Sequence, residues 1–327
     1  VRVVTPGTLT EDNLLDGRRN NHLAAVAVAR ERAGLAWVEL STGSFLVHEV
    51  PTDRLADELA RIEPAELLLA EELRGGDVPW LAGSTIPTTY RAAYDFGAEH
   101  GERTLRQHFA TGTLAGFGVQ DLPLGVGAAG ALLAYLGETQ QGALPNLRRL
   151  EVFRDSACMG LDRTTRQSLE LVDTLRGDRG TPLLSILDRT LTPMGARCLR
   201  GWLLAPLAEL QPILCRQEAV AELHSDDTLR HDVRARLDRV LDLERLASRA
   251  ALGRANARDL VGLRASLEQL PPLRARVASC GSPWLRDLVA AIDPLPDLAA
   301  ALAEALVDEP PATLKDGGLI RPGHDPN

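Results

Sequence analysis

The 327-residue chain has one lysine, few aromatic residues and no long apolar run. Its lysine, Lys315, stands against 35 arginines, a ratio that indicates coding bias rather than chemistry. The most apolar stretch, residues 126–136, contains two glycines and is shorter than the ~18 residues that a membrane span needs. No charged-then-apolar leader opens the sequence, so neither a membrane partner nor a secretory signal is predicted.

Motifs that would mark an enzyme are also missing. There is no GxxxxGK[ST] phosphate-binding loop, so ATP hydrolysis by these residues alone is not expected. No GxSxG or HExxH motif occurs. The four cysteines, at 158, 198, 215 and 280, form no CxxC pair. A zinc site is therefore not predicted, and isolated cysteines fit a reducing, cytoplasmic location.

What is present is the composition of a globular protein, with 45% hydrophobic and 25% charged residues. The net charge of -9 is unevenly spread. Residues 1–125 hold 11 basic and 18 acidic residues, whereas residues 126–327 hold 25 and 27. Neither part has the basic surplus of a free-standing DNA-binding protein.

The first part has the pattern of a mixed α/β domain. Strands are predicted over 22–28, 34–40 and 45–47, then a helix with Leu55, Leu59 and Ile62 on one face, then a strand over 65–70. This order resembles the ribonuclease H-like layout. Further helices are predicted over 95–110 and 125–140, followed by an irregular crossing from 145 to 159.

From Leu161 onward the pattern is helical, with prolines where helices would begin or end. The sequence has no fixed repeat period, which argues against a regular solenoid. The predicted fold class is therefore α/β plus all-α. The apolar stripes that predict the helices are Leu161–Thr165–Leu169–Val172, Leu229–Val233–Leu237–Val240, Leu260–Leu263–Leu267–Leu270 and Leu298–Leu302–Leu306.

A glycine pattern at 125–130, GVGAAG, matches the GxGxxG fingerprint of dinucleotide-binding turns. That interpretation needs a strand directly before the glycines and an acidic residue about 20 positions later. The sequence supplies neither. We therefore interpret the glycines as the start of a helix with small residues for close packing.

Carboxylates and imidazoles give little sign of a metal site. A two-metal nuclease needs several convergent carboxylates; Glu39 lies on a predicted strand, and the pair Glu71–Glu72 follows another. A solvent-exposed Glu39 is the favoured interpretation. Histidines 100 and 108, and 224 and 231, are spaced along helices without a third ligand, so surface positions are expected.

Arginines cluster along one helical stretch and could contact phosphates. Acidic residues are interleaved with them, which is typical of a solvated helix face with i,i+4 pairs, and we favour that interpretation. The arginines are Arg234, Arg236, Arg239, Arg245, Arg249, Arg254 and Arg258.

A series of short motifs resembles the MutS family of DNA mismatch repair proteins, in family order and over essentially the whole chain. In the first part they are VVTPGT at 3–8, NNHLAA at 20–25, LSTGSF at 40–45 and PAELL at 64–68. In the second part they are LDRTTR at 161–166, LEL at 169–171, LDRT at 187–190, TPMG at 192–195, LRGWLLAPL at 199–207, DLERL at 242–246 and KDGGLI at 315–320.

The resemblance implies a connector domain over 1–125, a linking helix and crossover over 126–160, and the first leg of a core and lever domain over 161–327, ending just before the clamp. It implies a parent that binds mismatched double-stranded DNA, hydrolyses ATP with Mg²⁺, forms a homodimer and recruits MutL, for which the connector is a docking surface. The mismatch-stacking Phe-x-Glu wedge and the Walker ATPase belong to other parts of the family. No catalytic, cofactor-binding or metal residue is therefore carried over.

The family-signature positions are expected to be structural. Asp162 is expected to cap a helix that carries Leu169 and Val172, and Thr192 to cap the next helix with Pro193 as its first residue. If Trp202 lies in the core, Trp202→Ala should destabilise the helical part by roughly 3–5 kcal/mol, and an unchanged melting temperature would show that it is exposed. The full set is Asp162, Thr165, Arg166, Leu169, Glu170, Thr192, Pro193, Met194, Gly195, Trp202 and Pro206.

Two other functions remain open. A free-standing connector–lever adaptor would bind MutL or modulate a full-length MutS, and a stop codon directly after Asn327 would favour it. A ribonuclease H-like nuclease would show metal-dependent cleavage that Glu39→Ala abolishes. For the leading interpretation, the chain alone is expected to bind heteroduplex and homoduplex DNA equally weakly.

Overall fold

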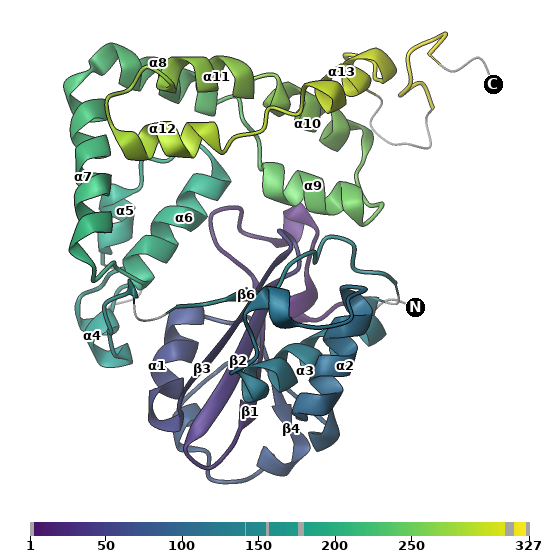
Figure 1. Cartoon of the computed structure of the whole chain (residues 1–327), viewed down its shortest axis with the longest axis vertical. Helices are drawn as coiled ribbons and strands as arrows, with labels where there is room; N and C mark the ends of the chain where they lie inside the picture. The colour runs from purple at the N-terminus through teal and green to yellow at the C-terminus, as the bar shows by residue number, and fades with distance from the viewer. Residues whose placement is uncertain (1–2, 141, 155–156, 176–179, 311–316, 325–327) are drawn as a thin grey trace. The chain divides into compact units, whose positions relative to one another are not determined.

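The computed structural model describes residues 3–140, 142–154, 157–175, 180–310 and 317–324. Contacts divide the chain into two compact units, both drawn in Figure 1. Unit 1 comprises Val1–Ile186 and Leu203–Ala205, and unit 2 comprises Leu187–Trp202 and Pro206–Asn327.

Unit 1 is built on a six-stranded sheet in the order β5-β4-β1-β2-β3-β6. β2 is antiparallel to β1 and β3, while β4 is parallel to β1, β5 to β4 and β6 to β3. The predicted three-strand meander and the ribonuclease H-like order are thereby confirmed. The strands are β1 (His22–Val28), β2 (Arg32–Glu39), β3 (Ser44–Pro51), β4 (Glu66–Ala70), β5 (Thr88–Arg91) and β6 (Glu151–Val152).

The strands β5 and β6 were not predicted from the sequence. Each lies at one edge of the sheet, and β6 falls in the segment that we expected to be irregular. Two residues of β6 are too few to show an alternating pattern. The four residues of β5 are all half-buried, so they carry no alternation either.

Helices cover both faces of the sheet (Figure 1). Along β2, Ala36 and Val38 belong to the core beneath α2 (Ala98–His108) and α3 (Pro123–Gln140). Leu35 and Trp37 belong to the core beneath α1 (Leu55–Ile62). The predicted apolar face of α1 is confirmed, because Leu55, Leu59 and Ile62 are buried.

The helix α3 lies within unit 1 and is buried along most of its length. The expected boundary at 125/126 therefore falls inside this helix. A helix that is apolar on all sides packs as a core element, which places it with the sheet rather than in a separate linker. Among the described helices, none is long and apolar enough to cross a membrane.

The glycines of the GxGxxG pattern serve close packing, as we interpreted them. A Cβ on Gly130 would lie 2.3 Å from the Cα of Gly101 on α2, and a Cβ on Gly101 would lie 2.3 Å from the carbonyl oxygen of Val126. On the sheet side, a Cβ on Gly34 would lie 2.1 Å from the backbone carbon of Leu124. The backbones thus touch where larger residues would separate them.

The remainder of the chain is helical, as predicted. Leu229 on α8 and Leu273 and Val277 on α11 form, with Cys280 and Val289, an apolar core in unit 2. The helices are α4 (Arg163–Ser168), α5 (Leu183–Leu187), α6 (Pro193–Leu204), α7 (Leu210–Ser225), α8 (Asp227–Leu237), α9 (Leu243–Ala251), α10 (Ala257–Leu267), α11 (Leu270–Val277), α12 (Pro283–Ala290) and α13 (Pro296–Ala305).

The predicted helical stripes run past the ends of their helices: Val240 lies beyond α8, Leu306 lies beyond α13, and Leu270 begins α11. The stripe that begins at Leu161 is the least accurate. The helix α4 ends at Ser168, so it carries neither Leu169 nor Val172. Glu170 has a φ of 45°, in the left-handed region that ends a right-handed helix. Leu169 is consequently 55% exposed.

Candidate functional site

The family-signature segment around α4 begins with a side-chain cap. Asp162 accepts a hydrogen bond from the backbone N–H of Thr165 at 2.6 Å, so the predicted cap is confirmed. This bond favours the charged carboxylate and holds the pKa of Asp162 below its ordinary value. A capped first turn offsets the small size of α4.

The helix α4 is tied to α1 by one residue, Asp57. Its carboxylate accepts from the backbone N–H of Arg163 at 2.7 Å, and its carbonyl oxygen accepts from Nη1 of Arg166 at 2.6 Å. The two ends of these contacts are more than 100 positions apart in the sequence. Sequence reasoning missed Asp57, because it reads as an ordinary polar residue of an amphipathic helix.

Arg166 is the most buried residue of α4, with 8% of its surface exposed. Its Nε lies buried without a hydrogen-bond partner. Burial lowers the pKa of Arg166, against the opposing effect of the nearby Glu58 carboxylate. The same side chain lines two cavities of unit 1, of about 570 and about 250 Å³.

The smaller cavity has a second, well-anchored arginine. Arg61 donates from Nε to Glu58 at 2.9 Å. Its guanidinium carbon lies 3.8 Å from the ring centroid of Phe153 and 5.2 Å from that of Trp37. Stacking on two aromatic faces fixes the direction of this cation within the unit.

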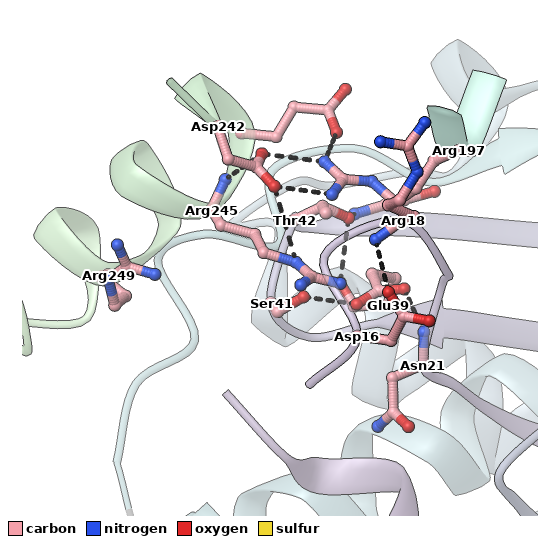
Figure 2. A network of polar contacts seen from close by, with 12 residues as sticks. Asp16, Arg18, Asn21, Glu39, Ser41, Thr42, Arg197, Asp242, Arg245 and Arg249 are labelled. Carbon is pink, nitrogen blue, oxygen red and sulfur yellow. Dashed lines mark hydrogen bonds and ion pairs between the residues drawn. The ribbon is translucent and has the colours of Figure 1, made fainter. Parts of the chain in front are cut away.

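Glu39 is not exposed, so our interpretation of it as a solvated residue is wrong. Only 1% of its surface is accessible, and its carboxylate accepts from the hydroxyl of Ser41 and the backbone N–H of Asn21 (Figure 2). It pairs in register with His22, whose pKa is lowered mainly by burial. The position at the end of β2 buries this carboxylate because polar groups of the adjacent loops fold over it.

Other carboxylates of unit 1 also act as structural acceptors. Glu66 accepts from the backbone N–H of Gly7 at 3.0 Å and from the hydroxyls of Thr89 and Tyr135 at 2.8 and 2.7 Å. Glu49 accepts from the first backbone N–H groups of α3. Such hydrogen bonds satisfy buried charge and fix neighbouring segments.

Within the described ranges, no three His, Cys, Asp or Glu side chains gather as a metal site would require. Glu71 and Glu72 are exposed. The histidines have separate partners: His100 meets Arg103, His108 meets the carbonyl of Leu147, and His231 that of Asp227. His224 is exposed, as is His231.

The second family-signature segment starts α6. Thr192 accepts from the backbone N–H of Gly195 at 3.0 Å, and Pro193 is the first helical residue, so the second predicted cap is confirmed. Met194 and Gly195 are half-buried in the first turn, and Pro206 follows the end of the helix at Leu204.

Trp202 is 37% exposed, so of the two places left open for it the structure favours the surface. The guanidinium of Arg216 stacks on the indole, with its central carbon 3.7 Å from a ring centroid. Its other neighbour is Trp284, with 6.1 Å between ring centroids. The residue therefore joins α6, α7 and α12 at the surface of unit 2 rather than filling its interior.

Ion pairs join several helices of unit 2 to one another, and Figure 2 shows the one at Arg197. Arg197 on α6 is 5% exposed and donates to Asp242 at 2.6 and 2.8 Å and to Glu244 at 2.6 Å. Burial alone would lower the pKa of Arg197, but these hydrogen bonds outweigh it and raise the pKa well above its ordinary value. Asp242 also caps α9.

The predicted solvated arginine face is right for some positions and wrong for others. Arg234, Arg239 and Arg258 are exposed. Arg245 is 2% exposed, and Arg249 pairs at 2.8 Å with Asp259 on the next helix, α10. Alternating charge within one helix cannot reveal that a partner lies on another helix.

Comparisons with known proteins agree with this architecture. Sequence models described as MutS domain II and MutS domain III match residues 21–148 and 164–322. The chain is 43% identical over 335 residues to the DNA mismatch repair protein MutS of Symbiobacterium thermophilum, covering 99% of this chain and 38% of that protein. It is 42% identical to the MutS of Thermosynechococcus vestitus over 339 residues, 99% of this chain and 39% of that protein.

A third relative, the MutS of Myxococcus xanthus, is 42% identical over 328 residues, 98% of this chain and 37% of its own. A six-stranded mixed α/β unit followed by a helical one, matched in that order by successive domain models, defines two middle domains of a larger protein class. The chain belongs to the MutS family of DNA mismatch repair proteins. It spans just under two fifths of the length of these relatives.

Proposed function

We propose that this chain is the part of a DNA mismatch repair protein that couples mismatch recognition to ATP hydrolysis. The observation that supports it is the pair of consecutive matches to MutS domains II and III, with about two fifths of all residues identical to those of several MutS proteins. Mismatched double-stranded DNA, ATP and Mg²⁺ would be bound by other parts of the homodimeric parent, in the cytoplasm. No catalytic step is assigned to the residues present.

The proposed roles follow the expected domains. Residues 1–125 form the connector and offer MutL a docking surface, and 161–327 form the first leg of the core and lever. Residues 126–160 lead from one to the other, and their first part, in α3, packs with the sheet. Capped helices joined by ion pairs, such as α6 and α9 through Arg197, suit a lever, because packed helices move as rigid bodies and can transmit a displacement.

A chimera tests the proposal. The matched region of the Symbiobacterium thermophilum MutS is replaced by residues 1–327 of this chain, and ATPase activity is measured with homoduplex and heteroduplex DNA. We expect the chimera to retain the difference that the unmodified relative shows between the two DNAs. A folded chimera with ATPase activity that no longer responds to a mispair would contradict the coupling role.

Partner binding has its own test with the chain alone. Fluorescence anisotropy is expected to show equally weak binding to heteroduplex and homoduplex DNA, because the chain is acidic overall. Binding of MutL is expected to map to residues of unit 1 by hydrogen exchange. Protection confined to unit 2 would remove the docking role from the connector.

A further inference from the structure

The cavity of about 250 Å³ in unit 1 concentrates positive charge. Among the described residues that line it, the charged ones are Arg54, Glu58, Arg61 and Arg166, three cations and one anion. Phe153 forms part of the wall. The cavity is many times larger than the roughly 10–15 Å³ that is needed to hold one water molecule. A compact polyatomic anion fits this space and this charge.

Arg166 brings a buried guanidinium with one unsatisfied N–H to the wall of the cavity. The side chain is 92% buried, and its Nη1 donates to the carbonyl of Asp57, whereas its Nε has no partner. A buried donor without an acceptor is unfavourable, by an amount comparable to the loss of a hydrogen bond. A turn of the guanidinium toward an oxyanion in the cavity would remove that cost.

Arginine and phosphate are matched in shape as well as in charge. The planar guanidinium presents its donors as a fork, which engages two oxygens of one oxyanion. Arg61 is held beside the cavity by Glu58 and by stacking on Phe153, so its cation is in place before any ligand arrives. Ordering such long side chains in advance lowers the entropy lost on binding.

We propose that this cavity binds a phosphate group, free or at the end of a small phosphate ester, with Arg166 as the principal ligand and Arg61 and Arg54 supplying the surrounding positive charge. This site is separate from the proposed coupling function. It lies where α4 docks on α1, so an occupied cavity would hold the family-signature segment 161–166 more firmly against the sheet domain.

Isothermal titration of the complete chain tests the site, with inorganic phosphate in one series and glycerol 3-phosphate in another. Sodium chloride at matched ionic strength serves as the blank. We expect saturable binding of at least one phosphate compound, and the tighter of the two identifies free phosphate or an ester as the ligand. Arg166→Gln should weaken it by roughly ten- to a hundredfold, the range that one charge-assisted hydrogen bond represents.

The matched control is Arg163→Gln, which removes the same charge from the same helix at an exposed position that does not line this cavity. It should leave the affinity within about twofold. Equal weakening by both substitutions would reduce the effect to general electrostatics and overturn the proposal, as would the absence of saturable binding to the native chain.

A second measurement does not depend on how well Arg166→Gln folds. In the native chain labelled with ¹⁵N-arginine, the Nε–H resonance of Arg166 should shift as phosphate is added. The shift should follow the same dissociation constant as the isothermal titration. The resonance is identified by its loss in Arg166→Lys. A phosphate titration that moves other arginine resonances but not this one would overturn the assignment.

Discussion

Different interactions stabilise the interior of each of the two units. In unit 1 the sheet buries both of its faces, and 24 described residues form one apolar core and 11 the other. In unit 2 the described residues form a buried cluster of only five, from α8, α11, α12 and the loop between the last two. Arg197, Arg200 and Arg245 are also buried, and Arg197 is held by the carboxylates of Asp242 and Glu244.

The difference shows which forces each unit depends on. Apolar burial stabilises by about 25 cal/mol for each Å² removed from water and is hardly sensitive to dilute salt. Buried ion pairs depend on complete hydrogen bonding and fail when one partner is lost. We therefore expect the stability of unit 1 to be little affected by the loss of a charge, and that of unit 2 to be little affected by the truncation of an apolar side chain. Four tests probe this contrast.

Two tryptophans give the largest expected effect. Trp37 on β2 is 3% exposed inside unit 1, whereas Trp202 in unit 2 is 37% exposed. Trp37→Ala should destabilise unit 1 by about 3–5 kcal/mol through the cavity it leaves. Trp202→Ala should destabilise unit 2 by about 1–2 kcal/mol, since it loses one cation–π and one aromatic contact.

Hydrogen exchange distinguishes the units, because the amides of β1 and β2 report on one and those of α6 and α7 on the other. Equal losses of protection for the two substitutions would mean that Trp202 belongs to a core after all. Unchanged protection in the Trp37→Ala chain would mean that apolar burial at Trp37 does not stabilise unit 1.

The second test removes a buried cation of unit 2 that two carboxylates hold. Arg197→Ala leaves the carboxylate of Asp242, which is 15% exposed, without its bidentate partner. We expect a loss of about 3 kcal/mol, at the low end for a broken buried pair because Glu244 is half exposed. Urea denaturation followed by exchange in α6 and α9 measures it. Arg258→Ala, at an exposed site on α10, should change stability by less than about 0.5 kcal/mol.

These positions also show what the sequence could and could not predict. Strands β1 to β4, the amphipathic α1 and the caps at Asp162 and Thr192 follow from patterns a few residues long, and the structure confirms them. Patterns of this kind report the local preference for helix or strand, which is enough to predict the fold class. They extended α4 too far because nothing in the sequence marks Glu170 for a positive φ.

Residues that contact partners far along the chain were beyond prediction. Asp57 meets Arg163 and Arg166 across more than 100 positions. Glu39 has nearer partners, Ser41 and Asn21, but a strand pattern does not show that they satisfy its carboxylate. Arg166 was expected to be structural because of the motif around it. Its unpartnered Nε and the cavity beside it exist only once α4 has docked on α1.

The third test concerns backbone contact in unit 1. Gly130→Ala places a Cβ 2.3 Å from the Cα of Gly101, so α2 and α3 must separate, at a cost of about 1–3 kcal/mol. Gly137→Ala on the same helix meets nothing within 4 Å and should stabilise by about 0.5–1 kcal/mol through helix propensity. Guanidinium denaturation of both variants measures the difference. Two substitutions with the same sign would show that packing does not decide the glycines of α3.

The smallest expected effect is a pH dependence in unit 2. Glu222 on α7 accepts from the backbone N–H groups of Gly281 and Ser282, at 2.6 and 2.7 Å, where α12 begins. These bonds, led by that from Gly281, hold the pKa of Glu222 below its ordinary value of 4.5. A depressed folded-state pKa stabilises the protein above the unfolded-state pKa, and this contribution disappears as pH falls through the folded-state value.

Glu222→Gln should therefore lower the melting temperature of unit 2 at pH 6, and the difference from the native chain should shrink as the pH falls from about 5 to about 3. The control Glu218→Gln removes the same charge at an exposed position one turn earlier on α7 and should show no such convergence. A Glu222→Gln difference that is constant with pH would mean that the side chain acts through shape rather than charge. The contact at Glu222 would then not depend on charge. The evidence that charged contacts stabilise unit 2 would rest on Arg197 and its neighbours.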